Sequence, residues 1–409
     1  MKKLIVLLII VGGIWFWWHH NQTEEVQRRE TEPTSETVAV LATEGQTESE
    51  IEEVRVIIRS TDVIDAFFYN QLDEEARLIY RIIRDGIAEG LEEIVLETDD
   101  IDKIHHIYRL VLFDHPEFFW VTGAALTTVT SWPDGRAYAT FKPEYGHVGE
   151  VKMAMQAEIE SAVDAFLVTV DPNLSDYEIV RMVYEYLIRN TTYNLDAPDH
   201  QNIYSVFVNR ESVCAGISRA AQLLLNRLGI FATYVVGEAY VPGTSEYPIA
   251  HAWNLVRVNG KYYYLDVTWG MPTFEAESTL AGRIDVIYDY LLLTGVMLYR
   301  THTLAEGIIM PEVTSLTHTF FYLNNMFYDS HDRDAVLEAM NTSILNQENS
   351  VSFQFATSEL FEEMRVVILE ELAPIAAQNL MAWHGLTSTH YYFRERENLN
   401  KITLYWLYE

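Results

Sequence analysis

The chain contains one cysteine, Cys214, and its position favours nucleophilic chemistry. Apolar residues recur after it at helical spacing: Ile217, Ala221, Leu224, Leu225 and Leu228. Gly229 is placed to end this helix. The cysteine therefore begins an amphipathic helix, where unpaired N–H groups and the helix dipole stabilise a thiolate. A buried and inert cysteine on the apolar face is the alternative for a cysteine considered alone.

A predicted β-hairpin downstream supplies a base and a carboxylate. Asn259-Gly260 lies between two alternating runs, which predicts a two-residue turn that pairs Val258 with Lys261. Counting outward from this turn places His251 and Asp266 on one face as diagonal neighbours. Together with the upstream cysteine, the hairpin offers a nucleophile, a base and an orienting group in the chain order Cys, His, Asp.

Three segments of the chain resemble the transglutaminase-like superfamily, which includes transglutaminases, related cysteine proteases and peptide N-glycanases. They are Val-Cys-Ala-Gly around Cys214, His-Ala-Trp-Asn-Leu at His251 and Leu-Asp-Val-Thr-Trp at Asp266. The resemblance covers residues 174–272. It implies a papain-like acyl-transfer site with Cys214 as nucleophile, His251 as base and Asp266 orienting the base. It does not choose among the reactions of the superfamily.

The resemblance also implies a side chain upstream of the cysteine that helps to stabilise the oxyanion. Gln201 is the candidate for this role, followed by Tyr204. Trp253 and Trp269 are predicted to line the substrate cleft. No acidic loop matches the calcium dependence that animal transglutaminases have through other domains, so we expect no metal and no cofactor.

The composition limits the partners of this protein. Its 409 residues include 60 acidic and 28 basic side chains, which give a formal net charge of −32. This charge repels nucleic acid and anionic lipid, so neither is expected as a partner. A single cysteine excludes an internal disulfide framework, so stability must come from packing.

The N-terminal segment predicts a membrane anchor. Two lysines precede an apolar run, Leu4 to Trp18, that ends in Trp-Phe-Trp-Trp. A helix of this length spans about 22 Å, which is short of the hydrocarbon core, but the aromatic end can lie in the interface. A cleaved signal peptide is the alternative. No small-residue cleavage site follows closely, so we expect an uncleaved single-pass anchor in the cell membrane, with the catalytic region extracellular.

The remaining pattern predicts an α+β fold, and the resemblance implies a papain-like (transglutaminase-like) core, flanked by small α+β domains. The expected division is a membrane anchor at 1–18, a disordered acidic tether at 19–53, an N-terminal α+β domain at 54–148, the catalytic core at 149–300 and a C-terminal α+β domain at 301–409. Both small domains are predicted in the order helix, strand, helix, strand, strand, so an internal repeat is a hypothesis. Thr98 is predicted to cap a helix that ends at Phe113, and 320–323 is predicted as a strand.

The sequence therefore predicts an extracytoplasmic, cysteine-dependent acyl transfer on protein amides, and the resemblance favours transfer from a glutamine carboxamide to an amine or to water. Cell-surface or cell-envelope proteins are the expected substrates. A cysteine protease of the same superfamily is one alternative, and a non-catalytic cell-surface binding module is another. The presence of all three side chains of the site favours catalysis, because a binding module does not need them.

Overall fold

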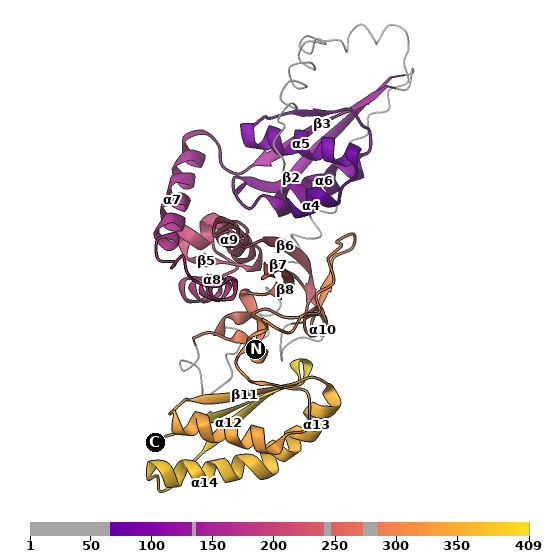
Figure 1. Cartoon of the computed structure of the whole chain (residues 1–409). Coiled ribbons are helices and arrows are strands. Elements are labelled where there is room, and N and C mark those ends of the chain that lie inside the picture. The colour runs from indigo at the N-terminus through magenta and orange to yellow at the C-terminus, as the bar shows by residue number, and fades with distance from the viewer. Residues whose placement is uncertain (1–65, 133–135, 241–246, 273–284, 409) are drawn as a thin grey trace, which may run out of the picture.

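The computed structural model describes residues 66–132, 136–240, 247–272 and 285–408. The predicted anchor and tether lie outside these residues. The fold is α+β, as the sequence predicted, and Figure 1 shows an N-terminal part, a central part and a C-terminal part that follow one another along the molecule. In the described part of the chain, no helix combines the length and the hydrophobicity needed to cross a bilayer.

The N-terminal part is a three-stranded antiparallel sheet with helices packed against it. Its helices are α4 (Phe67–Gln71), α5 (Glu74–Glu89) and α6 (Ile101–Asp114), and its strands are β1 (Ile94–Leu96), β2 (Val121–Ser131) and β3 (Ala137–Tyr145). The strand order is β1-β3-β2. The alternation of buried and exposed positions in β3 buries one face of the strand against the helices, as expected for a sheet with one covered face.

The predicted cap of α6 was wrong by two residues. The carboxylate of Asp100, not the hydroxyl of Thr98, accepts the backbone N–H of Lys103 at 2.9 Å. Thr98 instead accepts the N–H of Asp100 at 3.2 Å and so stabilises the turn before the helix. Several side chains in this segment can cap a helix, so sequence alone does not select among them.

The central part joins three helices to a four-stranded antiparallel sheet. The helices are α7 (Gly149–Leu167), α8 (Asp176–Asn190) and α9 (Cys214–Arg227), and the strands are β6 (Ala232–Ala239), β7 (Ile249–Val258), β8 (Lys261–Leu265) and β9 (His302–Leu304). The strand order is β8-β7-β6-β9. The predicted hairpin is confirmed, with Val258 opposite Lys261 and positive φ at both turn residues, Asn259 and Gly260.

Local sequence features set one end of each of two helices in the central part. Ser175 and Glu178 form the reciprocal capping box expected at the start of α8. Gly229 follows the end of α9 with a φ of +79°, a conformation that favours glycine. The inner face of α9 is buried along its whole length, because the helix packs on β6 and β7.

The C-terminal part has the same topology as the N-terminal part. Its elements are β10 (Phe327–Tyr328), α12 (Arg333–Leu345), β11 (Ser350–Phe355), α13 (Ser358–Val367), α14 (Ala373–His384), β12 (Tyr391–Arg396) and β13 (Lys401–Trp406). The strands β11-β13-β12 repeat the antiparallel order of β1-β3-β2, and β10 adds a parallel edge. The predicted strand at 320–323 was wrong: Phe320–Leu323 is a short helix, α11.

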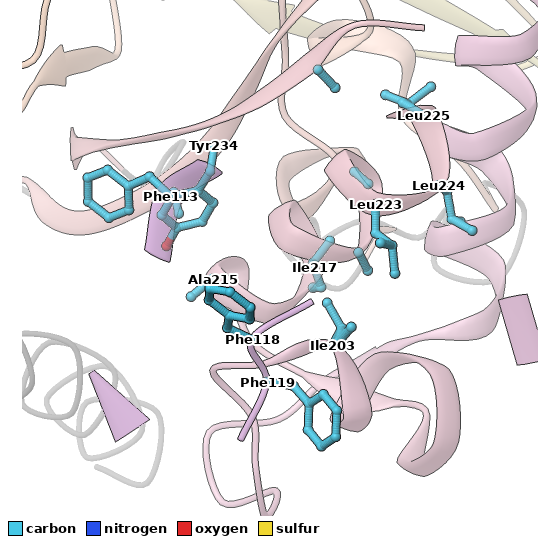
Figure 2. Packing of buried hydrophobic residues seen from close by; sticks show 14 of the residues in the cluster. Phe113, Phe118, Phe119, Ile203, Ala215, Ile217, Leu223, Leu224, Leu225 and Tyr234 are labelled. Atoms are coloured by element: carbon cyan, nitrogen blue, oxygen red, sulfur yellow. The ribbon is translucent and has the colours of Figure 1, made fainter. Parts of the chain in front are cut away.

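Specific contacts hold the three parts together. The side-chain amide of Gln222, on α9, donates to the backbone carbonyl of Phe113 at 2.9 Å. Figure 2 shows Phe113 beside Tyr234 of β6, with ring centroids 5.2 Å apart. On the other side, buried Asp289 pairs with Lys401 and Arg396 of the C-terminal part. The N-terminal and C-terminal parts are therefore both packed against the central part.

Candidate active site

Cys214 is the first residue of α9, as the sequence predicted, and only 4% of its surface is exposed. The residue before it, Val213, is extended and its own side chain does not cap the helix, so the N–H groups of the first turn are left for other partners. The carbonyls of His200 and Asn202 pass so close to Gly216 that a Cβ there would lie within 3 Å of both. The segment before the site therefore packs directly against the first turn of the helix.

His251 lies between Cys214 and Asp266. It is buried on β7, and its Nε2 donates to Oδ2 of Asp266 at 2.7 Å. The ring also forms a hydrogen bond with the Cys214 side chain. Because Nε2 faces the carboxylate, Nδ1 is the nitrogen left for the thiol. The structure thus brings together the three side chains that the sequence singled out, in the order that a nucleophile, a base and an orienting carboxylate require.

Asp266 is wholly buried and fully hydrogen-bonded. Its Oδ1 accepts the backbone N–H of Trp269 at 3.1 Å, and its Oδ2 accepts from both His251 and His302. Burial by itself raises the pKa of this carboxyl, but the charge and hydrogen bond of His251, helped by His302, outweigh burial and hold the pKa well below its usual range. The aspartate is therefore an anion that can orient a base.

The charge of Asp266 sets the protonation of His251. Burial lowers the pKa of His251, but the carboxylate charge and the hydrogen bonds with Asp266 and Cys214 outweigh it and raise the pKa to about 10. His251 is then an imidazolium at neutral pH. A cation in contact with a thiol favours the thiolate, which is the nucleophilic form.

A second imidazole, which no sequence pattern indicated, contacts the same carboxylate. His302, on β9, is buried, and its Nε2 donates to Oδ2 of Asp266 at 3.2 Å. Its Nδ1 accepts from the hydroxyl of Thr301 at 2.8 Å. Burial lowers the pKa of His302 despite the nearby carboxylate, so this ring is neutral and its tautomer is fixed by these two contacts. No short-range pattern links His302 to the hairpin, because β9 reaches the site by pairing with β6.

The tyrosine beside Cys214 is also one that the sequence did not indicate. Tyr193, on the two-residue strand β4 (Thr192–Tyr193), forms hydrogen bonds with both the side chain and the backbone of Cys214. Burial and the charge of a Cys214 thiolate raise the pKa of Tyr193 well above its usual value, so the phenol keeps its proton. The strand pairs with β5 (Glu211–Ser212), which leads into the cysteine. This strand pairing is the feature that would have placed Tyr193 beside Cys214.

One of the two predicted oxyanion candidates points away from the thiol. The Tyr204 hydroxyl donates to Glu158 of α7 at 2.7 Å, so this prediction was wrong. The π-helical turn Ser205–Asn209 begins directly after Tyr204, which remains on the side of α7. Gln201 offers its backbone carbonyl to Arg219 at 2.9 Å, and its side chain lines a pocket between the N-terminal and central parts.

The two tryptophans predicted to line a cleft instead enclose the histidine. Trp253 is wholly buried and Trp269 is 3% exposed. Their rings lie nearly parallel to that of His251, with centroids 6.1 and 5.1 Å away. The prediction that they line the substrate cleft is therefore not met by either side chain, because neither is exposed to a cleft. They keep water from His251 and so strengthen its interaction with Asp266.

Among the described residues, His251, Asp266 and His302 could also ligate a cation, since their ligand atoms lie within 4.8 Å of one another. However, both imidazoles direct Nε2 at one carboxylate oxygen. A cation would have to replace both hydrogen bonds. These contacts favour a proton network over a metal centre.

Comparisons with known proteins agree with this geometry. Residues 166–267 match the family model described as the transglutaminase-like superfamily, so the chain contains a transglutaminase-like domain, and this domain includes Cys214, His251 and Asp266. No curated protein matches the chain.

Solved structures give weaker matches. A structure described as a TGase is 16% identical with a TM-score of 0.24, covering 43% of this chain and 50% of its own. A proposed cysteine protease of Cytophaga hutchinsonii is 16% identical with a TM-score of 0.24, covering 37% of this chain and 65% of its own. A proposed protease of Parabacteroides distasonis is 12% identical with a TM-score of 0.21, covering 34% and 39%. The chain thus spans about half the length of the TGase structure.

Proposed function

We propose that this protein is a cysteine acyltransferase or hydrolase that acts on amide groups of proteins, with a glutamine carboxamide as the acyl donor. The observation that carries the proposal is a series of hydrogen bonds from Cys214, at the start of α9, through His251 to Asp266. A binding module gains nothing from a buried imidazolium beside a thiol, and burying such a charge is costly. The match of this segment to the transglutaminase-like superfamily supports the same conclusion.

In the first step, the thiolate of Cys214 attacks the carbonyl carbon of the amide. The carbonyl oxygen becomes an oxyanion, for which the phenol of Tyr193 and the backbone N–H of Cys214 are the proposed donors once the substrate oxygen displaces the hydrogen bond between these two groups. His251 donates its Nδ1 proton to the departing nitrogen as the C–N bond breaks. A glutamine donor releases ammonia and leaves a thioester on Cys214.

In the second step, an amine or a water molecule attacks the thioester. His251, now neutral, takes the proton of the attacking group, and the C–S bond breaks to restore the thiolate. Asp266 stabilises the imidazolium that re-forms and holds the ring in one orientation. An amine acceptor gives a transglutaminase and water gives a deamidase.

A cysteine protease of the same superfamily is the first alternative, because the same two steps cleave a peptide bond when the leaving nitrogen belongs to the main chain. We prefer the glutamine side chain because the resemblance to transglutaminases favours it. A non-catalytic binding module is the second alternative, and it predicts an unreactive thiol.

One assay separates these possibilities. The full chain is incubated with a glutamine-containing protein and a labelled primary amine, and label incorporation, ammonia release and chain cleavage are followed together. Incorporation identifies a transglutaminase, ammonia alone a deamidase, and cleavage a protease. Cys214→Ala should abolish whichever signal appears. The absence of all three signals across cell-envelope proteins would overturn the proposal and favour the binding module.

We also propose that the protein is anchored in the cell membrane by residues 1–18, with the catalytic part outside and cell-surface or cell-envelope proteins as substrates. The support is the apolar run ending in tryptophans and the acidic segment that follows it. Protease treatment of intact cells should release a fragment that begins between residues 19 and 53. Recovery of the untouched full-length protein from the cytosol would contradict this location.

A further inference from the structure

A second functional feature is the pocket between the N-terminal and central parts, here called the interdomain pocket. Its volume is about 280 Å³. One wall is formed by α6 and the residues after it, including Arg109, Phe113 and His115. The opposite wall is formed by residues 199–202 and by Arg219 of α9. The pocket exists only because the two parts are docked together.

The interdomain pocket lies next to the proposed active site. Arg219 is five residues after Cys214 on the same helix, a rise of about 7.5 Å. Residues 199–202, which line the pocket, pack against the first turn of that helix at Gly216. On the β-sheet side, Val236 lines the pocket and pairs with Ala252, the neighbour of His251. The pocket is therefore within two to four residues of extended chain from the thiol, at about 3.3 Å per residue.

Two arginines and two acidic residues line the interdomain pocket, and among the described residues neither arginine forms an ion pair with either acid. Arg219 donates to a backbone carbonyl and stacks over Tyr234 at 4.4 Å, and among the described residues no ion pair joins Arg219 or Arg109 to a carboxylate. Burial lowers the pKa of Arg109, as expected for a cation without a counter-charge. Of the two lining acids, Asp199 already pairs with His147 at 2.8 Å, and Glu306 is exposed to solvent.

Two arginines that pair with no carboxylate among the described residues stand out in a protein as acidic as this one. The chain carries a formal net charge of −32, so an acidic ligand is repelled at long range and needs local cations to be bound. The pocket supplies two guanidinium groups, which bind carboxylates through paired N–H donors. His115 adds an Nε2 that is buried with no hydrogen-bond partner among the described residues. Phe113 and Phe118 supply apolar walls for the stem of a bound side chain.

We propose that the interdomain pocket is a specificity subsite that binds an aspartate or glutamate side chain of the polypeptide substrate, close to the reacting amide. The proposal rests on the proposed function, because it assumes a polypeptide acyl donor at Cys214. It assigns the N-terminal part a role in substrate selection. Arg109 and Arg219 bind the carboxylate, and the aromatic walls contact the methylene groups.

The test measures binding without turnover. Full-chain Cys214→Ala is titrated with fluorescent peptides that contain one glutamine and one glutamate, placed about two to four residues before or after it. Each peptide is matched by its glutamate methyl ester, which has nearly the same shape and no charge. At least one acidic peptide should bind about tenfold more tightly than its ester, the effect of a charge-assisted hydrogen bond.

Two substitutions identify the pocket as the binding site. Arg109→Gln and Arg219→Gln should each remove most of this preference and leave the ester peptide unaffected. Arg227→Gln is the matched control, because Arg227 lies on the same helix but pairs with Glu160 at the surface. Arg109 makes no hydrogen bond or ion pair among the described residues, so its replacement should preserve the melting temperature even if the Arg219 variant unfolds more easily.

Failure of this proposal and failure of the proposed function give different results. Equal binding of every acidic peptide and its ester would overturn the subsite, and turnover of the same peptides by the unmodified protein would show that the proposed function stands. An acidic preference that survives both arginine substitutions would also overturn it. An acidic preference that is lost in both variants would support the subsite even if no peptide were turned over.

Discussion

Replacing Asp266 with asparagine should leave the His251 ring uncharged near pH 8 and slow the reaction of Cys214. The pKa of His251 is raised to about 10 although burial alone lowers it, because the Asp266 charge is the largest opposing contribution. Without that charge the burial contribution remains, so the pKa should fall to its ordinary value of 6.5 or below. At about pH 8 a group with a pKa of 6.5 is protonated in about 3% of molecules, so the charged form of His251 falls about thirtyfold.

Alkylation of Cys214 by iodoacetamide measures this change directly. Cys214 is the only cysteine, so the intact mass of the protein reports on one site. In the unmodified protein the alkylation rate should stay high through neutral pH, because the imidazolium stabilises the thiolate. The rate should change only near pH 10, where His251 loses its proton. In Asp266→Asn the plateau should disappear, and the rate at neutral pH should fall, because no imidazolium then stabilises the thiolate.

The control for this experiment is Asp164→Asn, an identical change at an exposed position of α7. Its pH profile should match that of the unmodified protein. If the profile of Asp266→Asn also matched, while its circular dichroism showed an intact fold, the carboxylate would not set the charge of His251 and the reasoning would be refuted.

Three further substitutions test neighbouring residues. His302→Leu should lower kcat about tenfold, because a donor to Asp266 is lost, and His302→Gln should restore part of it, since the amide nitrogen can replace Nε2. Tyr193→Phe should lower kcat about a hundredfold with little change in KM, as expected for loss of an oxyanion donor, whereas iodoacetamide reactivity should change much less. Asp289→Asn should lower the free energy of unfolding by about 3 kcal/mol, because Lys401 would be left buried and unpaired; thermal and urea unfolding measure it.

Each of these predictions has a matched control on the same chain. His384→Leu removes a partly buried histidine far from the site, Tyr204→Phe removes the hydroxyl that bonds to α7, and Asp329→Asn alters an exposed carboxylate of the C-terminal part. An equal loss of kcat in His302→Gln and His302→Leu would contradict a positioning role. A Tyr193→Phe variant as active as Tyr204→Phe would exclude its phenol from catalysis. A melting curve unchanged by Asp289→Asn would show that its ion pairs do not stabilise the docked domains.

The central features of the site could be predicted because they depend on local patterns. Helical periodicity after Cys214 and the Asn259-Gly260 turn fix the start of α9 and the register of the hairpin. With the register known, the face shared by His251 and Asp266 follows from the period of a strand. The same periodicity gave most helices and strands of the two small domains.

The missed residues reach the site through long-range pairing. His302 is 36 residues after Asp266 and arrives on a three-residue strand, and its position depends on pairing with β6 rather than on any nearby pattern. Tyr193 and Tyr204 are both tyrosines upstream of Cys214, and only the backbone path between them decides which one meets the thiol. The short apolar run at 320–323 fits a strand or a helical turn equally well, and its packing selected the helix.

The central claim is that Cys214 forms a covalent acyl-enzyme with a protein amide. Intact-mass spectrometry tests it most directly, on the full chain mixed with a glutamine-containing peptide and quenched in acid at short times. The account predicts an adduct equal to the mass of the peptide less ammonia, which maps to Cys214, is absent in Cys214→Ala and disappears when a primary amine is added. A thiol that iodoacetamide readily alkylates, but that never forms an adduct with any glutamine peptide or cleavage product, would contradict the account.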